Sequence, residues 1–133
     1  MKNIAILASG SGSNAENIVN YFKDRKDISF KIYSNKKDAF VLERAKRLGV
    51  PYESFLKSEL EDGTLLSKLT AEKVDFVVLA GFLLKIPDEM LTVFPDKIVN
   101  IHPSLLYPNE IFFVPTVCTY WFFALFSKPT KKN

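Results

Sequence analysis

Cysteine and histidine are nearly absent from the sequence, which carries one of each, Cys118 and His102, in 133 residues. A single cysteine excludes an intrachain disulfide and a cysteine-based metal site. With only one histidine beside it, the chain also lacks the ligands from which zinc sites are usually built. We therefore predict that no metal takes part in its function.

A strong charge excess and a long apolar run at the start of the chain are missing as well. The net charge is +3, too small to indicate a nucleic acid as partner. The first apolar run, residues 4–8, is too short for the core of a signal peptide. It is better explained as a first β-strand, so we expect a cytoplasmic location.

Short apolar runs alternate with segments of helical spacing along the first hundred residues. Strands are predicted at residues 4–8, 28–33, 51–55, 74–80 and 98–102. Four helices are predicted. The first begins at a capping box of Ser13 and Glu16, the second runs from a cap at Asp38 to a stop at Gly49, the third lies around residues 65–69, and the fourth begins with Pro87 as its first residue. The order predicts an α/β fold, a doubly wound, mostly parallel sheet of about five strands. The apolar run 74–80 is typical of a strand covered on both faces, and the alternating run 28–33 of a half-buried one.

A glycine-rich turn follows the first predicted strand. Residues 10–15, GSGSNA, match G-x-G-x-x-G/A between a strand and a helix. Glycines let the backbone approach a phosphate, and the helix N-terminus presents free N–H groups to it. We predict a phosphate site here in preference to a plain strand–helix turn with Ser13 as the helix cap.

The acid that a dinucleotide oxidoreductase places after its second strand is missing. Residues 34–37 read SNKK, and the next acid, Asp38, is better explained as a helix cap. A single phosphate therefore fits the turn better than a dinucleotide, although a dinucleotide-binding oxidoreductase stays open as an alternative function.

An amide and an imidazole stand together at the end of the last predicted strand. Asn100 and His102 point to the same side of that strand, because side chains alternate with a period of two. Asn100 can donate a hydrogen bond to a developing oxyanion, and His102 can transfer a proton near neutral pH. The pair suits attack of an amine on a carbonyl. A structural role for a lone histidine at a strand end stays open.

Four segments in this order resemble the glycinamide ribonucleotide formyltransferases, which are folate-dependent enzymes. They are residues 9–14 (SGSGSN), 34–45 (SNKKDAFVLERA), 77–82 (VVLAGF) and 100–106 (NIHPSLL). The last string is specific to folate-dependent formyltransferases as a group, and the turn favours the glycinamide ribonucleotide branch over methionyl-tRNA formyltransferase. The resemblance covers residues 1–106, about four fifths of the chain.

The resemblance implies a reaction and a set of site residues. The amine of 5-phosphoribosylglycinamide would attack the formyl carbon of the co-substrate 10-formyltetrahydrofolate in purine biosynthesis. The substrate phosphate would be bound by Gly12, Ser13 and Asn14. The folate site would be lined by Leu83, Leu84, Lys85, Ile86 and Asn100. Asn100 and His102 would be the catalytic residues, as oxyanion-binding and proton-transferring groups.

The sequence departs from the family after Leu106. The family continues with a glycine-containing loop, a later aspartate that completes a catalytic trio, and further strands and a long helix. Here Glu110 is the only acid after Leu106, and residues 111–126 are uncharged and rich in aromatic side chains. An arginine that the family often places before the third helix also has no counterpart in residues 57–62.

We therefore expect residues 1–106 to form a nucleotide-binding domain and residues 107–133 an atypical tail that arose by truncation or a change of reading frame. Three roles stay open for this tail, namely packing on the sheet, self-association of the chain, and weak anchoring to a membrane. A membrane span is not expected, because the uncharged stretch is shorter than the roughly 20 residues needed and Pro115 interrupts it. Without the aspartate we expect formyl transfer at least about a hundredfold below that of a complete relative, or a non-catalytic remnant that only associates with other chains.

Overall fold

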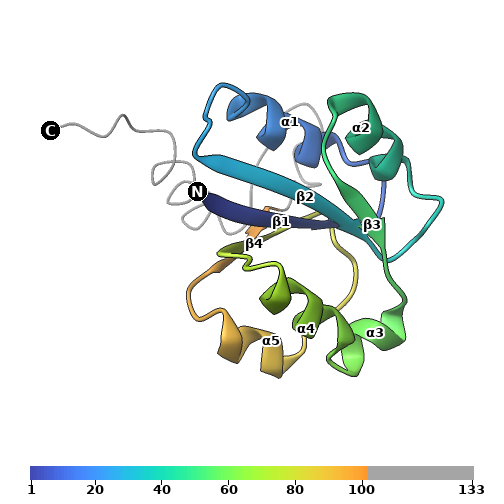
Figure 1. Ribbon diagram of the computed structural model, residues 1–133. Helices are drawn as coiled ribbons and strands as arrows, with labels where there is room; N and C mark the ends of the chain where they lie inside the picture. Colours follow the sequence, from blue (N-terminus) through green and yellow to red (C-terminus); the bar gives the residue numbers. More distant parts are fainter. Residues whose placement is uncertain (102–133) are drawn as a thin grey trace, which may run out of the picture.

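The computed structural model describes residues 1–101 of the chain. These residues form a five-stranded parallel sheet with helices on both faces (Figure 1). The strands are β1 (Lys2–Ala8), β2 (Ile28–Ser34), β3 (Tyr52–Ser54), β4 (Phe76–Ala80) and β5 (Ile98–Ile101). The helices are α1 (Ser13–Tyr21), α2 (Phe40–Leu48), α3 (Lys57–Glu61), α4 (Thr64–Ala71) and α5 (Asp88–Val93). The predicted doubly wound α/β fold is confirmed.

The order of the strands reverses beside β1. The sheet order is β3-β2-β1-β4-β5, so the chain moves outward from β1 to β3 and then crosses back to place β4 on the other side of β1. Open α/β sheets bind ligands beyond the carboxyl ends of the strands at such a reversal. The end of β1, where the glycine-rich turn begins, therefore lies at the position that the fold favours for a ligand.

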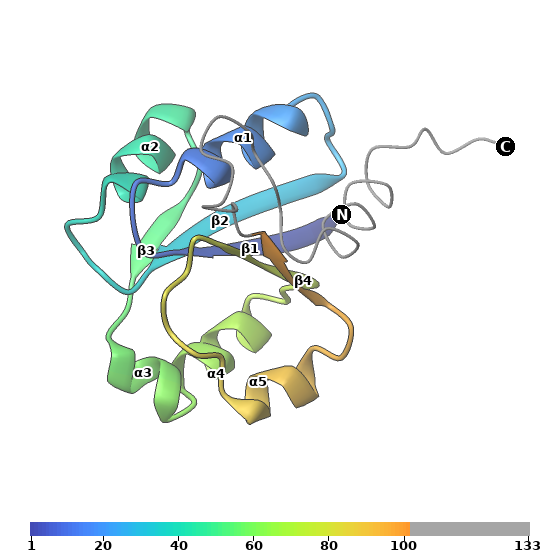
Figure 2. The ribbon, with the colours of Figure 1, turned by 180° about the vertical axis from the view of Figure 1, so that it is seen from behind.

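The sheet separates two apolar layers. Ile4 and Ile6 of β1 pack toward α1 and α2, whereas Ala5 and Leu7 pack toward α4 and α5. Both views of the ribbon show α1 and α2 on one side of the sheet and α3, α4 and α5 on the other (Figures 1 and 2). Because both faces of β1 are covered from residue 4 onward, residues 4–8 are apolar without alternation.

The prediction that β2 is half-buried holds for residues 29–31, which are partly buried, but fails at the carboxyl end of the strand. Tyr33, on the face expected to be exposed, is fully buried with the layer that contains Phe55 and Leu60. β2 lies inside the sheet, and the segment from β3 through α4 covers this second face. α3, which was not predicted, supplies part of that cover through Leu60.

Neither predicted side-chain cap forms. Gly12, in a left-handed conformation, precedes α1, and the Glu16 carboxylate pairs with Arg44 instead of closing a capping box. Ala39 rather than Asp38 precedes α2, also without a side-chain cap. The tertiary contacts of both segments replace the local hydrogen bonds that the pattern predicted.

The other helix boundaries agree more closely with the sequence. Gly49 ends α2 in a left-handed conformation, as predicted. Pro87 stands directly before α5 instead of inside it, and the acids Asp88 and Glu89 occupy the first turn. None of the helices in residues 1–101 is long and apolar enough to cross a membrane. His102 and the predicted tail, residues 107–133, lie outside the described residues.

Candidate functional site

The glycine-rich turn and the end of β4 enclose a small cavity of about 140 Å³. Its lining consists of Gly10, Ser11, Gly12, Ser13, Asn14, Ala80 and Gly81. The cavity lies where β1 and β4 end side by side, which is the reversal point of the sheet. The structure thus brings the three predicted phosphate-binding residues together in the lining of one cavity, beside Ala80 at the end of β4 and Gly81 after it.

Gly12 is required at its position for two reasons. Its φ of +82° lies in the left-handed region, which residues with a Cβ rarely adopt. A Cβ at this position would also lie 2.3 Å from Cγ2 of Val41 in α2. Gly10 carries neither restriction, since a Cβ there meets nothing within 4 Å. The close approach of α2 to the turn therefore requires a glycine at position 12 but not at position 10.

A buried hydroxyl joins the turn to two neighbouring segments. Ser9, which is 2% exposed, donates from Oγ to Oδ1 of Asn35 at 2.7 Å and accepts from the N–H of Leu83 at 3.0 Å. The backbone N–H of Ser9 also donates to the carbonyl of Gly81. The start of the glycine-rich turn, the loop after β2 and the segment after β4 are thus held together by the side chain of Ser9.

Sequence reasoning missed the roles of Ser9 and Asn35. Each is a small polar residue directly after an apolar strand, at the sheet edge where ligands bind. That is the same signal that singled out Asn100. A search for small polar residues directly after every predicted strand would have found both Ser9 and Asn35.

The predicted folate segment, residues 83–86, begins at Leu83, whose N–H donates to the Ser9 hydroxyl. Leu83 is 73% exposed, which is unusual for a large apolar side chain, and Lys85 is exposed beside it. Ile86 instead packs into the core layer of α4 and α5. Leu83 is therefore the member of the segment that is most available to a ligand, and the assignment of the four residues stays a prediction.

Asn100 lies at the exposed end of β5, two strands from the turn. It pairs in register with Leu79 of β4, which in turn pairs with Leu7 of β1. Two strand spacings correspond to about 10 Å. An elongated ligand held at the turn can therefore extend across β4 toward Asn100. His102 lies beyond the described residues, so its pairing with Asn100 stays a prediction.

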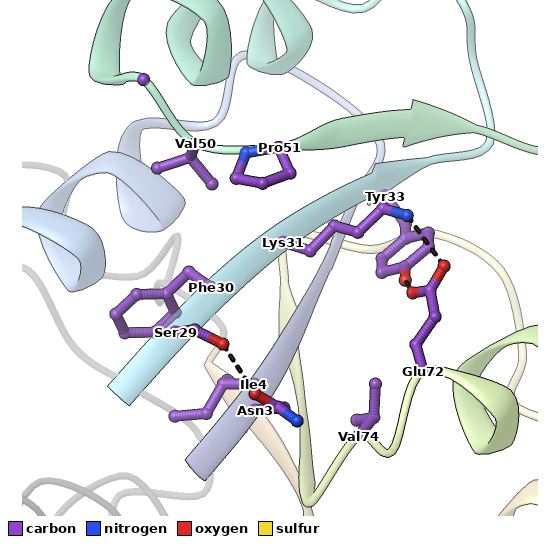
Figure 3. A pocket seen from close by; sticks show the side chains of 11 residues that line it. Asn3, Ile4, Ser29, Phe30, Lys31, Tyr33, Val50, Pro51, Glu72 and Val74 are labelled. Carbon is purple, nitrogen blue, oxygen red and sulfur yellow. Dashed lines mark hydrogen bonds and ion pairs between the residues drawn. The ribbon is translucent and has the colours of Figure 1, made fainter. Parts of the chain in front are cut away.

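A cavity of about 410 Å³ lies away from this site, near the amino ends of β1 and β2 (Figure 3). Its polar side chains bind one another. Ser29 donates to Asn3 at 2.7 Å, and the Glu72 carboxylate accepts from Lys31 and from the Tyr33 hydroxyl. A cavity whose polar groups are already paired offers little to a ligand, so we place the candidate site at the glycine turn.

The charged network beside this cavity predicts a loss of stability in acid. Burial opposes the ionisation of Glu72, but the hydrogen bonds from Tyr33 and Lys31 outweigh it and lower its pKa. Glu53 behaves in the same way, with Lys68 and Lys31 as donors, so its pKa is also lowered. Groups with a lowered pKa in the folded state stabilise the protein above their unfolded pKa, and that contribution is lost as the pH falls.

We therefore expect the free energy of unfolding to fall as the pH drops below about 4.5, the ordinary value for both carboxyl groups. Urea denaturation between pH 3 and pH 7, on the order of one pH unit per step, measures it. The double variant Glu53→Gln/Glu72→Gln is expected to lose part of this pH dependence. An identical slope in the variant would show that other carboxyl groups cause it.

The described residues hold no group of three or more histidine, cysteine, aspartate or glutamate side chains that could bind a metal ion.

Comparison with known proteins gives one consistent family. Residues 2–108 match the family described as Formyl transferase. The chain is 36% identical to the phosphoribosylglycinamide formyltransferase of Escherichia coli over 116 residues and 40% identical to the chloroplastic one of Arabidopsis thaliana over 114 residues. Among solved structures, glycinamide ribonucleotide transformylase 1 from Symbiobacterium toebii matches 80% of this chain with a TM-score of 0.70 and 38% identity.

The match covers only part of each relative. About 80% of this chain aligns with 55% of the Escherichia coli protein, with 39% of the Arabidopsis thaliana protein and with 53% of the Symbiobacterium toebii chain. This chain thus spans about half the length of the bacterial relatives that it matches.

Proposed function

This chain belongs to the formyl transferase family, and from that premise we propose that it transfers a formyl group from 10-formyltetrahydrofolate to the amine of 5-phosphoribosylglycinamide in purine biosynthesis. The observation that carries the proposal is the cavity of the glycine turn at the reversal point of the sheet. Its size and its glycine backbone suit a single phosphate, and the relatives reported above bear the name of this activity.

The phosphate of the nucleotide would sit on the turn. Residues 12–14 begin α1, where backbone N–H groups have no partner inside the helix and the helix dipole favours an anion. The hydroxyl of Ser13 and the amide of Asn14 line the same cavity and can add hydrogen bonds. Phosphate binding would orient the rest of the nucleotide across β4, toward Asn100.

The reaction at Asn100 would be an attack of the nucleotide amine on the formyl carbon. A C–N bond forms, the carbonyl oxygen gains negative charge, and the side-chain amide of Asn100 would donate a hydrogen bond to it. The bond from the formyl carbon to N10 of the folate then breaks. His102 would move the proton from the attacking amine toward the leaving nitrogen. Leu83 and the residues up to Ile86 would hold the folate beside β5.

Several further properties belong to the same proposal. Residues 1–106 would act as the nucleotide-binding domain, residues 107–133 would be a tail that permits self-association, and the protein would be cytoplasmic. No nucleic acid or metal would take part. The small-molecule partners would be the nucleotide and the folate.

A dinucleotide-binding oxidoreductase is the alternative. The end of β2 weighs against it, because Ser34 is followed by Asn35, whose side chain already accepts a hydrogen bond from Ser9, and then by two lysines. No acid stands where ribose hydroxyls would be held. Titration with NAD beside titration with 5-phosphoribosylglycinamide separates the two functions, since we expect heat of binding only with the latter.

A formyl-transfer assay tests the proposal. We expect the 133-residue chain, at high protein concentration, to transfer formyl groups to the nucleotide, and Asn100→Ala to lower that rate about a hundredfold by removing an oxyanion donor. The control is Asn20→Ala, an exposed asparagine near the end of α1, which is expected to leave the rate unchanged. Equal rates for Asn100→Ala and the unchanged chain would remove Asn100 from the reaction, and absence of both transfer and nucleotide binding would refute the function.

A further inference from the structure

Helix α2 holds two carbonyl groups of the glycine turn without lining the cavity itself. The N–H of Val41 donates to the carbonyl of Gly10 at 3.1 Å. Nε of Arg44 donates to the carbonyl of Ser11 at 2.6 Å. No residue of α2 belongs to the cavity lining among the described residues, so both carbonyls are held on the side of the turn that faces α2.

These two bonds decide where the N–H groups of the turn point. In a planar trans peptide, the C=O of one residue and the N–H of the next point in opposite directions. A Ser11 carbonyl fixed toward α2 therefore turns the N–H of Gly12 away from α2. The Gly10 carbonyl fixes the N–H of Ser11 in the same way. Both donors are thus directed away from α2, and the cavity is lined by Gly10, Ser11 and Gly12 of the turn but by no residue of α2.

Arg44 has a second contact that concerns the charge near the cavity. Its Nη1 lies 2.7 Å from Oε1 of Glu16, in the first turn of α1. An unpaired carboxylate so close to the helix N-terminus would repel a bound phosphate. Arg44 neutralises it, and the guanidinium serves both partners because its donors form a fixed, planar fork.

We propose that Arg44 is a positioning residue for the substrate phosphate: through its bond to the Ser11 carbonyl it orients the N–H of Gly12 into the cavity, without touching the ligand. This role rests on the proposed function, because it assumes that the cavity binds the phosphate of the nucleotide. The hydrogen bond to Ser11 and the neutralisation of Glu16 contribute separately to nucleotide affinity, and variants of the two residues can measure each contribution.

Three variants separate geometry from charge. Arg44→Lys keeps the positive charge but loses the fork that reaches both Ser11 and Glu16. Arg44→Gln loses the charge as well and leaves Glu16 unpaired. The double variant Arg44→Gln/Glu16→Gln removes both charges together. The matched control is Arg47→Lys, one turn further along α2, which stacks on Phe40 and makes no contact with the turn among the described residues.

Calorimetric titration of the full 133-residue chain is the experiment. We expect the Kd for 5-phosphoribosylglycinamide to rise about tenfold in Arg44→Lys and in the double variant, more in Arg44→Gln, and not at all in Arg47→Lys. The Kd for 10-formyltetrahydrofolate is expected to stay unchanged in all four, whereas a general loss of structure would raise both values. In the nuclear magnetic resonance spectrum, the shift of the Gly12 amide on nucleotide binding is expected to shrink in Arg44→Lys.

The outcomes are distinguishable. If the unchanged chain does not bind the nucleotide, the proposed function and this role both fall. If it binds, and Arg44→Lys binds equally well with the same Gly12 amide shift, only the role of Arg44 is overturned. Full recovery of affinity in the double variant would also overturn it, because charge alone would then explain the effect of Arg44→Gln.

Discussion

Gly12→Ala is expected to lower the free energy of unfolding by about 3 kcal/mol or more. A left-handed backbone costs a residue with a Cβ about 1–2 kcal/mol. Overpacking of a filled space adds about 1–3 kcal/mol, and the new Cβ would lie 2.3 Å from Cγ2 and 2.9 Å from the Cα of Val41. Because a backbone atom is among the contacts, α2 must move, and the bonds that it makes with the turn are strained.

Two other glycines separate these contributions. Gly49→Ala meets the same left-handed φ but no atom within 4 Å, so it is expected to cost only the backbone part. Gly10→Ala meets neither restriction and is expected to be close to neutral. Urea denaturation of the three variants gives the comparison. A loss in Gly12→Ala no larger than that in Gly49→Ala would show that the contact with Val41 is absent in solution.

The largest expected effect on binding comes from Gly10→Asp. The side chain has room, since nothing lies within 4 Å of its Cβ, and Gly10 lines the cavity. Two unit charges about 4 Å apart interact by about 4 kcal/mol at an effective dielectric constant of 20. Part of this is screened by solvent and salt, so we expect the Kd for 5-phosphoribosylglycinamide to rise at least about a hundredfold, which corresponds to about 2.7 kcal/mol.

Gly10→Asn is the matched control, because it has the shape of aspartate without its charge. It is expected to change the Kd far less, and the difference between the two variants is expected to shrink as salt is added. Calorimetry at low and high salt measures both. Similar values of Kd for the two variants would mean that the anionic part of the nucleotide is bound elsewhere.

Much of the fold could be predicted because its signals are local. The strands β1 and β4 contain short apolar runs, which can be recognised without knowledge of the segments that they pair with. The burial of Tyr33 could not be predicted, because it depends on the segment from β3 to α4 that covers the far face of β2. The missed helix α3 is only five residues long, and it buries a single side chain, Leu60. The capping box at Ser13 failed because Glu16 pairs with Arg44 of α2, and the cap at Asp38 failed because Ala39 is the residue that precedes α2.

The candidate site likewise has a part that could be predicted from local sequence and a part that could not. The residues of the turn form a contiguous motif after a strand, so the sequence alone pointed to them. Arg44 is 33 residues from Ser11, and Leu83 is 74 residues from Ser9. No local sequence pattern predicts such contacts, because these residues come together only once the sheet has formed. The residues that hold the turn in place were therefore missed, whereas the residues of the turn itself were recognised, and their role as a phosphate site stays a prediction.

The strand order also has a consequence for how the site is made during folding. β1 and β2 pair across a short stretch of chain, but β1 pairs with β4 only after the residues up to Leu79 are available. Contacts between distant residues form late because closing a long loop costs chain entropy. The glycine turn is synthesised about 70 residues before Ala80 and Gly81, which complete the lining of the cavity. A nascent chain consequently carries the glycine turn long before the lining of its cavity is complete, and the cavity is complete only after β4 has docked.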